Sequence, residues 1–359
     1  MMPVMSTSST NDSTALVTID NTAARRYRAA SKSSNTQRSY RSAVADDPPD
    51  DSPNGRRRAA ARKYPAWSTW AAAHGTPALP AAPDAIAAYL AELADAGASV
   101  ATIHQRRAAI AWTHRAANLP DPTNTETVRA VAHGIARTNT RPRRQSAPAL
   151  VDDLERMAAV LEQAVTSTTP GTAAHLRAVR DRAVILLAWT GAFRRSEIAA
   201  LVVDDMTHRR QSGRAVMLVT VRRSKTDQQG DGKVKVIPSA SAHPQRDPVA
   251  AVKAWTRLAR ITAGPLFRPV NRHGQIADHA LQGQDIADIV RRTVDAAGLD
   301  PRITAHGLRA GLITAGAIAG ASTTGLRAQS GHESESAFSG YVRDSGVLAM
   351  DAVLKAMGE

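Results

Sequence analysis

One patch of β-branched residues limits how much sheet this chain can form. Strand-like sequence occupies residues 216–221 and again 234–237, and a polar segment, 222–232, separates the two runs. Such a pattern predicts a hairpin with a long charged loop. Elsewhere the ordered sequence has apolar residues at helical spacing. We therefore predict a mainly α-helical chain of two domains, in which the second domain contains one small sheet.

The composition excludes several classes of protein. Among 359 residues there is no Cys, which rules out disulfide scaffolds, thiolate zinc sites, iron–sulfur clusters and cysteine nucleophiles. An apolar run as long as 183–189 is still far short of the roughly 20 residues that span a bilayer. The segment 1–35 has neither a basic nor an apolar region typical of a secretory signal. We expect a cytoplasmic protein with no membrane association, working at the nucleoid.

The charge indicates a polyanionic partner. Lys and Arg number 46 against 32 for Asp and Glu, which gives a net charge of +14 and a pI near 10.8. Contacts to phosphate release condensed counterions, so a basic excess of this kind favours double-stranded DNA as the partner. A GC-rich genome would explain the preference for Arg over Lys, but it does not explain the excess of bases over acids.

The first half reads as a tail followed by a helical domain. Residues 1–34 have few apolar side chains and no periodicity, so they are predicted to be a disordered tail. Residues 35–136 are predicted to form a helical bundle, in which Asp84 and Ser99 are candidate N-caps. An Asp- and Pro-rich insertion at 46–55 interrupts this bundle, because no helix accommodates it.

A basic segment separates the two halves. Residues 137–147 include Arg141, Arg143 and Arg144 and are predicted to be a linker that touches phosphate backbone. A second domain is expected at 148–359. Its predicted helices cover 150–165, 176–189, 248–259, 284–297, 306–319, 323–330 and 347–357.

Within the second domain, cationic groups occur in an ordered series that ends in a tyrosine. Its members are Arg194, Lys225, His306, Arg309, His332 and Tyr341. Each is commonplace alone: the His-x-x-Arg spacing also occurs at His104 and Arg107, where we interpret it as a solvated helix face. The chain has no GxxxxGK[ST], GxGxxG or HExxH pattern, so nucleotide and metal-dependent hydrolysis are disfavoured.

Taken together, this series resembles the catalytic set of the tyrosine recombinase (phage integrase) family. The resemblance extends over about residues 36–355 and implies a core-binding, SAM-like DNA-clamp domain before a catalytic domain of the DNA breaking-rejoining type. It makes Arg194 the first catalytic arginine, Lys225 the hairpin lysine, and His306 and Arg309 the second-box pair. His332 is then the following histidine and Tyr341 the nucleophile, while Glu197 matches a supporting acidic position.

These residue types suit phosphoryl transfer without a metal or other cofactor. Arg194 and Arg309 can hold non-bridging phosphate oxygens bidentately, and fixed cations stabilise the charge that develops in an in-line attack. Tyr341 needs a base, for which His306 is the candidate, and Lys225 can protonate the leaving 5′-oxygen. His332 would orient the phosphate. The resulting 3′-phosphotyrosyl link would conserve bond energy, so religation would need no ATP.

The remaining predictions concern partners. The resemblance implies that an apolar tail helix from Val347 to Met357 docks on a neighbouring protomer in a tetramer on DNA, although packing on its own domain is an equally good reading. Arg106 and Arg107 could enter a DNA groove, although a solvated helix face is an equally good reading. A site-specific recombinase is the leading interpretation; a type IB-like topoisomerase and a catalytically silent DNA-binding protein are the alternatives.

Overall fold

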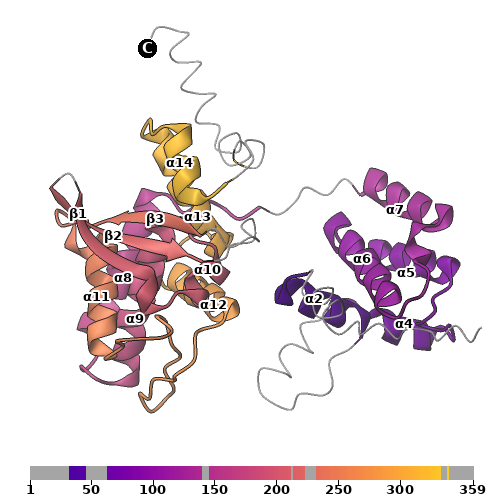
Figure 1. Ribbon diagram of the computed structural model, residues 1–359, viewed down its shortest axis with the longest axis horizontal. Coiled ribbons are helices and arrows are strands. Elements are labelled where there is room, and N and C mark those ends of the chain that lie inside the picture. Colours follow the sequence, from indigo (N-terminus) through magenta and orange to yellow (C-terminus); the bar gives the residue numbers. More distant parts are fainter. Residues whose placement is uncertain are drawn as a thin grey trace, which may run out of the picture. The chain divides into compact units, whose positions relative to one another are not determined.

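The computed structural model describes residues 32–45, 63–139, 145–211, 213–222, 232–332 and 338. The chain divides into two compact units after Arg143, a position inside the predicted basic linker. The two units are described separately (Figure 1). No helix in the described ranges has both the length and the apolar character needed to cross a membrane.

The first unit is helical throughout its described residues. Its elements are α2 (Ser34–Val44), α4 (Trp67–Ala73), α5 (Pro83–Asp95), α6 (Val100–Ala116), the 3-10 helix η1 (Pro122–Asn124) and α7 (Glu126–Thr138). Trp67, Trp70 and Tyr89 pack at the centre of its core, with ring centroids 5.3 to 5.6 Å apart. Trp67 and Trp70 are thus core residues, as their place on apolar faces predicts.

The two predicted helix caps of this unit have different outcomes. The hydroxyl of Ser99 accepts a hydrogen bond from the Thr102 amide at 3.2 Å, which confirms the first cap. The prediction for Asp84 is wrong, because α5 begins one residue earlier, at Pro83, and Asp84 lies in its first turn. Proline is favoured at the first helical position, where no amide donor is needed, and here it outweighs the capping preference of aspartate.

The second unit combines helices with one antiparallel sheet. Its helices are α8 (Val151–Thr166), α9 (Ala173–Thr190), α10 (Arg195–Ala200), α11 (Pro248–Leu258), α12 (Gly283–Ala296), α13 (Ala305–Ile318) and α14 (Thr323–Ser330), with 3-10 turns η2 (Val203–Asp205) and η3 (Pro244–Arg246). α9 is the core helix, since residues 183–188 along it are all buried. It packs against α8, α11 and α13.

The sheet has the order β1-β2-β3, with β1 (Met206–Gln211), β2 (Arg214–Val221) and β3 (Lys233–Pro238). The predicted hairpin is confirmed as β2 and β3, which pair in register from Val221 with Lys233 to Val216 with Pro238. Strand β1 has no counterpart in the prediction, because five of its six residues are exposed and its sequence carries no apolar alternation.

A short extended segment, 147–149, passes beneath α13 and fixes its position. The Ala149 amide donates to the Gly307 carbonyl at 2.9 Å, and the Ala149 carbonyl accepts from the Trp189 indole at 2.8 Å. Gly307 and Gly311 face this segment at helical spacing. A Cβ atom on Gly311 would lie 1.8 Å from the Ala149 oxygen, so the approach requires glycine.

Candidate active site

Arg194 is presented by a sharp turn between α9 and α10. We call residues 191–193 the α9–α10 turn. A Cβ atom on Gly191 would meet the Phe193 ring at 2.0 Å, and Ala192 has a φ of 45°, in the left-handed region. Phe193 is buried and anchors the turn in the core. Arg194 follows as the N-cap residue of α10 and is only partly buried.

Glu197 holds Arg194 from the first turn of α10. Its carboxylate accepts from the Arg194 guanidinium at 2.7 Å and from the Arg194 amide at 2.9 Å. The side chain of Glu197 is buried, so this is not an ordinary surface pair. Glu197 thus holds both the backbone and the side chain of Arg194 from the same helical turn.

Arg309 is brought to the same turn by α13. It is 1% exposed, and its Nη1 donates to the Ala192 carbonyl at 2.8 Å, two residues before Arg194. Residues 117 positions apart in the sequence are thereby joined. A planar guanidinium tied at one nitrogen to a backbone carbonyl keeps a fixed orientation, which suits it to electrostatic stabilisation.

His332 contacts the other side of the Arg309 guanidinium. Its Nε2 lies 3.1 Å from Arg309 Nη2, and its Nδ1 lies 2.8 Å from the Ser330 hydroxyl. The same Arg309 nitrogen lies 3.5 Å from His332 Nδ1, so the guanidinium approaches both ring nitrogens. Burial, and then the charges of Arg309 and Arg194, lower the pKa of His332 to about 3. The ring is therefore neutral near pH 7.

His306 lies in the first turn of α13, one turn before Arg309. Its amide donates to the Thr304 cap, and its side chain reaches solvent. Partial burial, followed by the charges of Arg309 and Arg194, lowers the pKa of His306 below its ordinary value of 6.5. A neutral imidazole can accept a proton, so this environment suits a general base.

The structure adds Lys235, a residue that the sequence reasoning passed over. It lies on β3 and is 3% exposed, and its ammonium donates to the Gly191 carbonyl at 2.7 Å and the Gln329 carbonyl at 2.8 Å. Burial lowers the pKa of Lys235 to about 7, while the charge of Glu197 opposes that shift. No local signal identified it, because the alternation of Lys and Val in residues 233–236 predicts that the valines face inward.

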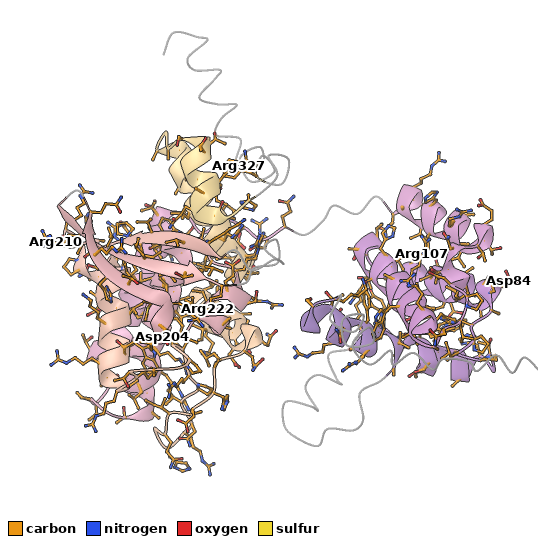
Figure 2. All side chains as sticks on the ribbon, viewed as in Figure 1. Asp84, Arg107, Asp204, Arg210, Arg222 and Arg327 are labelled. Atoms are coloured by element: carbon orange, nitrogen blue, oxygen red, sulfur yellow. The ribbon has the colours of Figure 1, made fainter. Side chains whose placement is uncertain are left out.

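Two of the predicted catalytic residues, Lys225 and Tyr341, lie outside the described residues. Lys225 belongs to the connection between β2 and β3, which begins at Arg222; that side chain forms an ion pair with buried Asp205 (Figure 2 labels Arg222). Phe338, three residues before Tyr341, is buried and its ring centroid lies 6.0 Å from that of His332.

Other predicted features also fall outside that part of the chain. They are residues 1–31 of the predicted tail 1–34, the insertion 46–55, the linker residues Arg141, Arg143 and Arg144, and the tail helix 347–357. The predicted end of the tail is wrong by one residue, because α2 begins at Ser34, where the Ser33 hydroxyl caps it.

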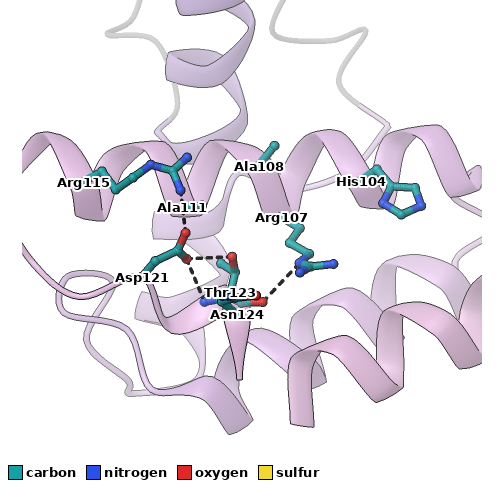
Figure 3. Close-up of a pocket in the computed structure, with 8 residues that line it drawn as sticks. All are labelled: His104, Arg107, Ala108, Ala111, Arg115, Asp121, Thr123 and Asn124. Atoms are coloured by element: carbon teal, nitrogen blue, oxygen red, sulfur yellow. Dashed lines mark hydrogen bonds and ion pairs between the residues drawn. The ribbon is translucent and has the colours of Figure 1, made fainter. Parts of the chain in front are cut away.

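The two arginines proposed to enter a DNA groove have different surroundings. Arg106 is turned toward α2, where its Nη1 donates to the Ala43 carbonyl at 2.8 Å. Arg107 lines an open pocket of about 550 Å³ together with His104 and Arg115 (Figure 3). Its Nε donates to the Thr123 carbonyl at 3.2 Å. Arg107 therefore remains the better placed of the two for an external anion.

Metal ligation has no support in the described ranges, where no group of three or more His, Asp or Glu side chains could hold an ion. The cations described above gather around the α9–α10 turn instead. Their common chemistry is the binding of an anion.

A family model and a sequence relative both match this chain, and both belong to the same class of protein. The phage integrase family model matches residues 157–346. An integrase/recombinase xerD homolog of Selenomonas ruminantium is 31% identical over 292 residues, which cover 80% of this chain and 80% of that protein.

Two solved structures share the fold at low sequence identity. XerH recombinase bound to a palindromic difH substrate aligns with a TM-score of 0.52 at 16% identity, over 76% of this chain and 72% of that one. A lambda integrase dimer bound to a COC′ core site aligns with a TM-score of 0.54 at 17% identity, over 90% of this chain and 75% of that one. The likeness confirms the mainly helical two-domain fold, and with the sequence matches it establishes that the chain belongs to the phage integrase family, the tyrosine site-specific recombinases, which cleave and rejoin DNA.

Proposed function

We propose that this chain is a site-specific integrase that acts on double-stranded DNA through a 3′-phosphotyrosyl intermediate, with no metal or ATP. The observation that carries the proposal is that Arg309 binds the turn that presents Arg194 and also contacts His332. Three groups suited to binding one phosphodiester thus come from three separate parts of the chain.

In the proposed reaction, Tyr341 attacks the scissile phosphorus in line. The Tyr341 oxygen forms the new P–O bond while the bond to the 5′-oxygen breaks. His306 accepts the phenolic proton, and Lys225 donates a proton to the 5′-oxygen. Arg194 and Arg309 hold the non-bridging oxygens, where charge accumulates.

Rejoining follows by the reverse of these steps. A 5′-hydroxyl from the partner strand attacks the phosphotyrosyl bond and releases Tyr341. Because the energy of the original phosphodiester is retained in that bond, strand exchange needs no external energy source. Exchange between two sites requires several protomers, and we propose a tetramer on DNA in which the helix expected from Val347 to Met357 contacts a neighbour.

The first unit would also contact the DNA, as the DNA-clamp domain that the family resemblance implies. Arg107 and His104, on one side of α6, line the pocket described above and are suited to phosphate contacts. The linker arginines, Arg141, Arg143 and Arg144, would follow the backbone between the two units. We propose that the protein acts in the cytoplasm at the nucleoid.

Covalent trapping tests this function. The protein is incubated in EDTA with nicked duplexes that cover its own genomic neighbourhood, and a denaturant-resistant protein–DNA band is sought. Tyr341→Phe should abolish the band and keep DNA binding, because only the hydroxyl is removed. Tyr64→Phe, which removes a phenolic hydroxyl from the first unit, is the matched control and should keep both activities.

The outcomes separate the alternatives. DNA binding without a band in the wild type favours a silent DNA-binding protein. A band accompanied by relaxation of supercoils but no exchange between two trapped sites favours a type IB-like topoisomerase. A band in Tyr341→Phe shows that the nucleophile is another residue.

A further inference from the structure

Strand β3 has an inverted pattern of polarity. Val234 and Val236 point outward and are 57% and 39% exposed, while Lys235 points inward and is 3% exposed. Burying an ammonium group costs free energy unless every donor is satisfied. A lysine in this position therefore indicates a specific role for its charge or its hydrogen bonds.

The Lys235 ammonium contacts two segments of the active site at once. It donates to the carbonyls of Gly191 at 2.7 Å and Ala192 at 3.4 Å, both in the α9–α10 turn. It also donates to the Gln329 carbonyl at 2.8 Å, near the end of α14. The first segment leads directly to Arg194, and the second leads, three residues later, to His332.

Gln329 reinforces the same connection. Its side-chain amide donates to the carbonyls of Val236 at 2.9 Å and Thr190 at 3.1 Å, and its oxygen accepts from the Val236 amide at 3.3 Å. Residues 235 and 236 of β3 thus bind Gln329 through its backbone and its side chain. In Figure 1, α14 lies beside β3.

The bonded carbonyl of Ala192 links this arrangement to Arg309. That oxygen accepts from Arg309 Nη1 at 2.8 Å, and the Lys235 ammonium approaches it from β3. Ala192 itself has a left-handed φ of 45°, a conformation that a non-glycine residue keeps only when its surroundings hold it. Lys235 is one of the groups that hold it.

We propose that Lys235 is a positioning residue that fixes the spacing between Arg194, Arg309 and His332. This inference rests on the proposed function. Lys235 is distinct from Lys225, to which the proton transfer is assigned. Its hydrogen bonds are all to backbone carbonyls of the two site segments, so it acts on the substrate through Arg194, Arg309 and His332.

Lys235→Met tests the inference, because methionine keeps an unbranched chain and removes every donor. Lys253→Met is the matched control, since Lys253 is exposed on α11 in the same unit and the substitution is chemically the same. Single-turnover cleavage is measured at saturating DNA on two substrates, one with a 5′-oxygen leaving group and one with a 5′-bridging sulfur, which leaves without protonation.

We expect Lys235→Met to slow cleavage of both substrates by about 10- to 100-fold, as an ångström-scale displacement of catalytic groups does. DNA affinity should change by less than about threefold, since the groups that contact DNA remain. Lys253→Met should match the wild type throughout. Lys225→Ala should behave differently. It should cleave the 5′-oxygen substrate slowly and recover the wild-type rate on the 5′-sulfur substrate.

Three results would overturn the inference. Unchanged cleavage by Lys235→Met means that the spacing does not depend on this residue. If Lys235→Met cleaves the 5′-sulfur substrate at the wild-type rate, Lys235 is the proton donor. Failure of the wild type to form an adduct on either substrate removes the proposed function, and the inference with it.

Should Lys235→Met fail to fold, Gln329→Leu provides a second test. This variant removes the parallel side-chain contacts and must give the same slow cleavage on both substrates; wild-type rates in that variant would contradict the inference.

Discussion

Gly311 and Ala149 approach so closely that a Cβ atom on the glycine would lie 1.8 Å from the alanine carbonyl oxygen. That oxygen also accepts the Trp189 indole N–H, so it cannot move away without breaking a hydrogen bond. The contact sets the depth at which α13 packs against segment 147–149. Since α13 carries His306 and Arg309, it also sets where both residues lie.

The first prediction follows from this contact. Gly311→Ala should lower the free energy of unfolding of the second unit by about 1–3 kcal/mol or more, because backbone must shift to admit the methyl group. Denaturant unfolding measures this change. Gly283→Ala is the control in the same unit, since its new Cβ would meet only the Arg195 side chain at 3.6 Å, an ordinary contact distance. Equal stabilities for the two variants would contradict the packing described.

The second prediction concerns the buried pair of Arg194 and Glu197. Glu197→Gln keeps the shape and removes the charge, so Arg194 should lose its fixed orientation and cleavage should slow by about tenfold or more. Unfolding should become easier by about 1–3 kcal/mol. The exposed pair of Glu126 and Arg129 has the same spacing on α7, and Glu126→Gln should change stability by less than about 0.5 kcal/mol. A similar loss of stability in both variants would mean that burial does not make the Arg194–Glu197 pair more stabilising than an exposed pair.

The third prediction concerns protonation of His332. Its pKa is about 3 in the folded chain and 6.5 when unperturbed, so the unfolded chain binds more protons between these values. Stability should therefore fall as the pH drops from about 6.5 toward 3, by at most about 1.4 kcal/mol per pH unit for one proton. His332→Gln should flatten this slope, and exposed His279→Gln should leave it unchanged.

A direct measurement checks the cause of that shift. Imidazole nitrogen NMR should show His332 neutral throughout the range from pH 5 to 8. Arg194→Gln should raise the pKa of His332, because the Arg194 charge is one of the causes of its depression. A titration of His332 near pH 6.5 in the wild type would refute the predicted environment.

The fourth prediction concerns divalent cations. Adduct formation should proceed at the same rate in EDTA and in magnesium, because the cations around the α9–α10 turn supply the positive charge that a metal would supply. The rate of appearance of the denaturant-resistant band measures this. A strict requirement for magnesium in the cleavage step, with DNA binding unaffected, would contradict the assignment of that role to Arg194 and Arg309.

Local sequence patterns predicted much of this fold. Apolar spacing predicted α8, α9 and α11 to α14 in the second unit; α14 matches its predicted bounds, and the β2–β3 hairpin follows from its β-branched runs. Strand β1 was not predicted, because its residues are polar and mostly exposed. It pairs with β2 through backbone hydrogen bonds, which leave no pattern in the sequence. The approach of Gly311 to Ala149 is a contact between distant segments, and no local pattern encodes it.

The candidate active site was also predicted in part from the sequence. Arg194, Arg309 and His332 are recognisable from their order along the chain, and the structure brings them together. The placement of Lys225 and Tyr341 stays a prediction. Lys235 was missed because a lysine that alternates with valines on a strand is expected to face solvent, and only the tertiary structure shows it facing inward between Gly191 and Gln329.

The inward-facing Lys235 also has a consequence for ligand linkage. Below its pKa of about 7, Lys235 forms with Arg194 and Arg309 a group of cations whose mutual repulsion opposes folding, and a bound phosphodiester offsets that repulsion. DNA is thus expected to act on the thermal stability of the second unit as well as being its substrate. At a DNA concentration 100 times the dissociation constant, binding should raise the free energy of unfolding by about 2.7 kcal/mol. The melting temperature should therefore follow occupancy of the site by DNA.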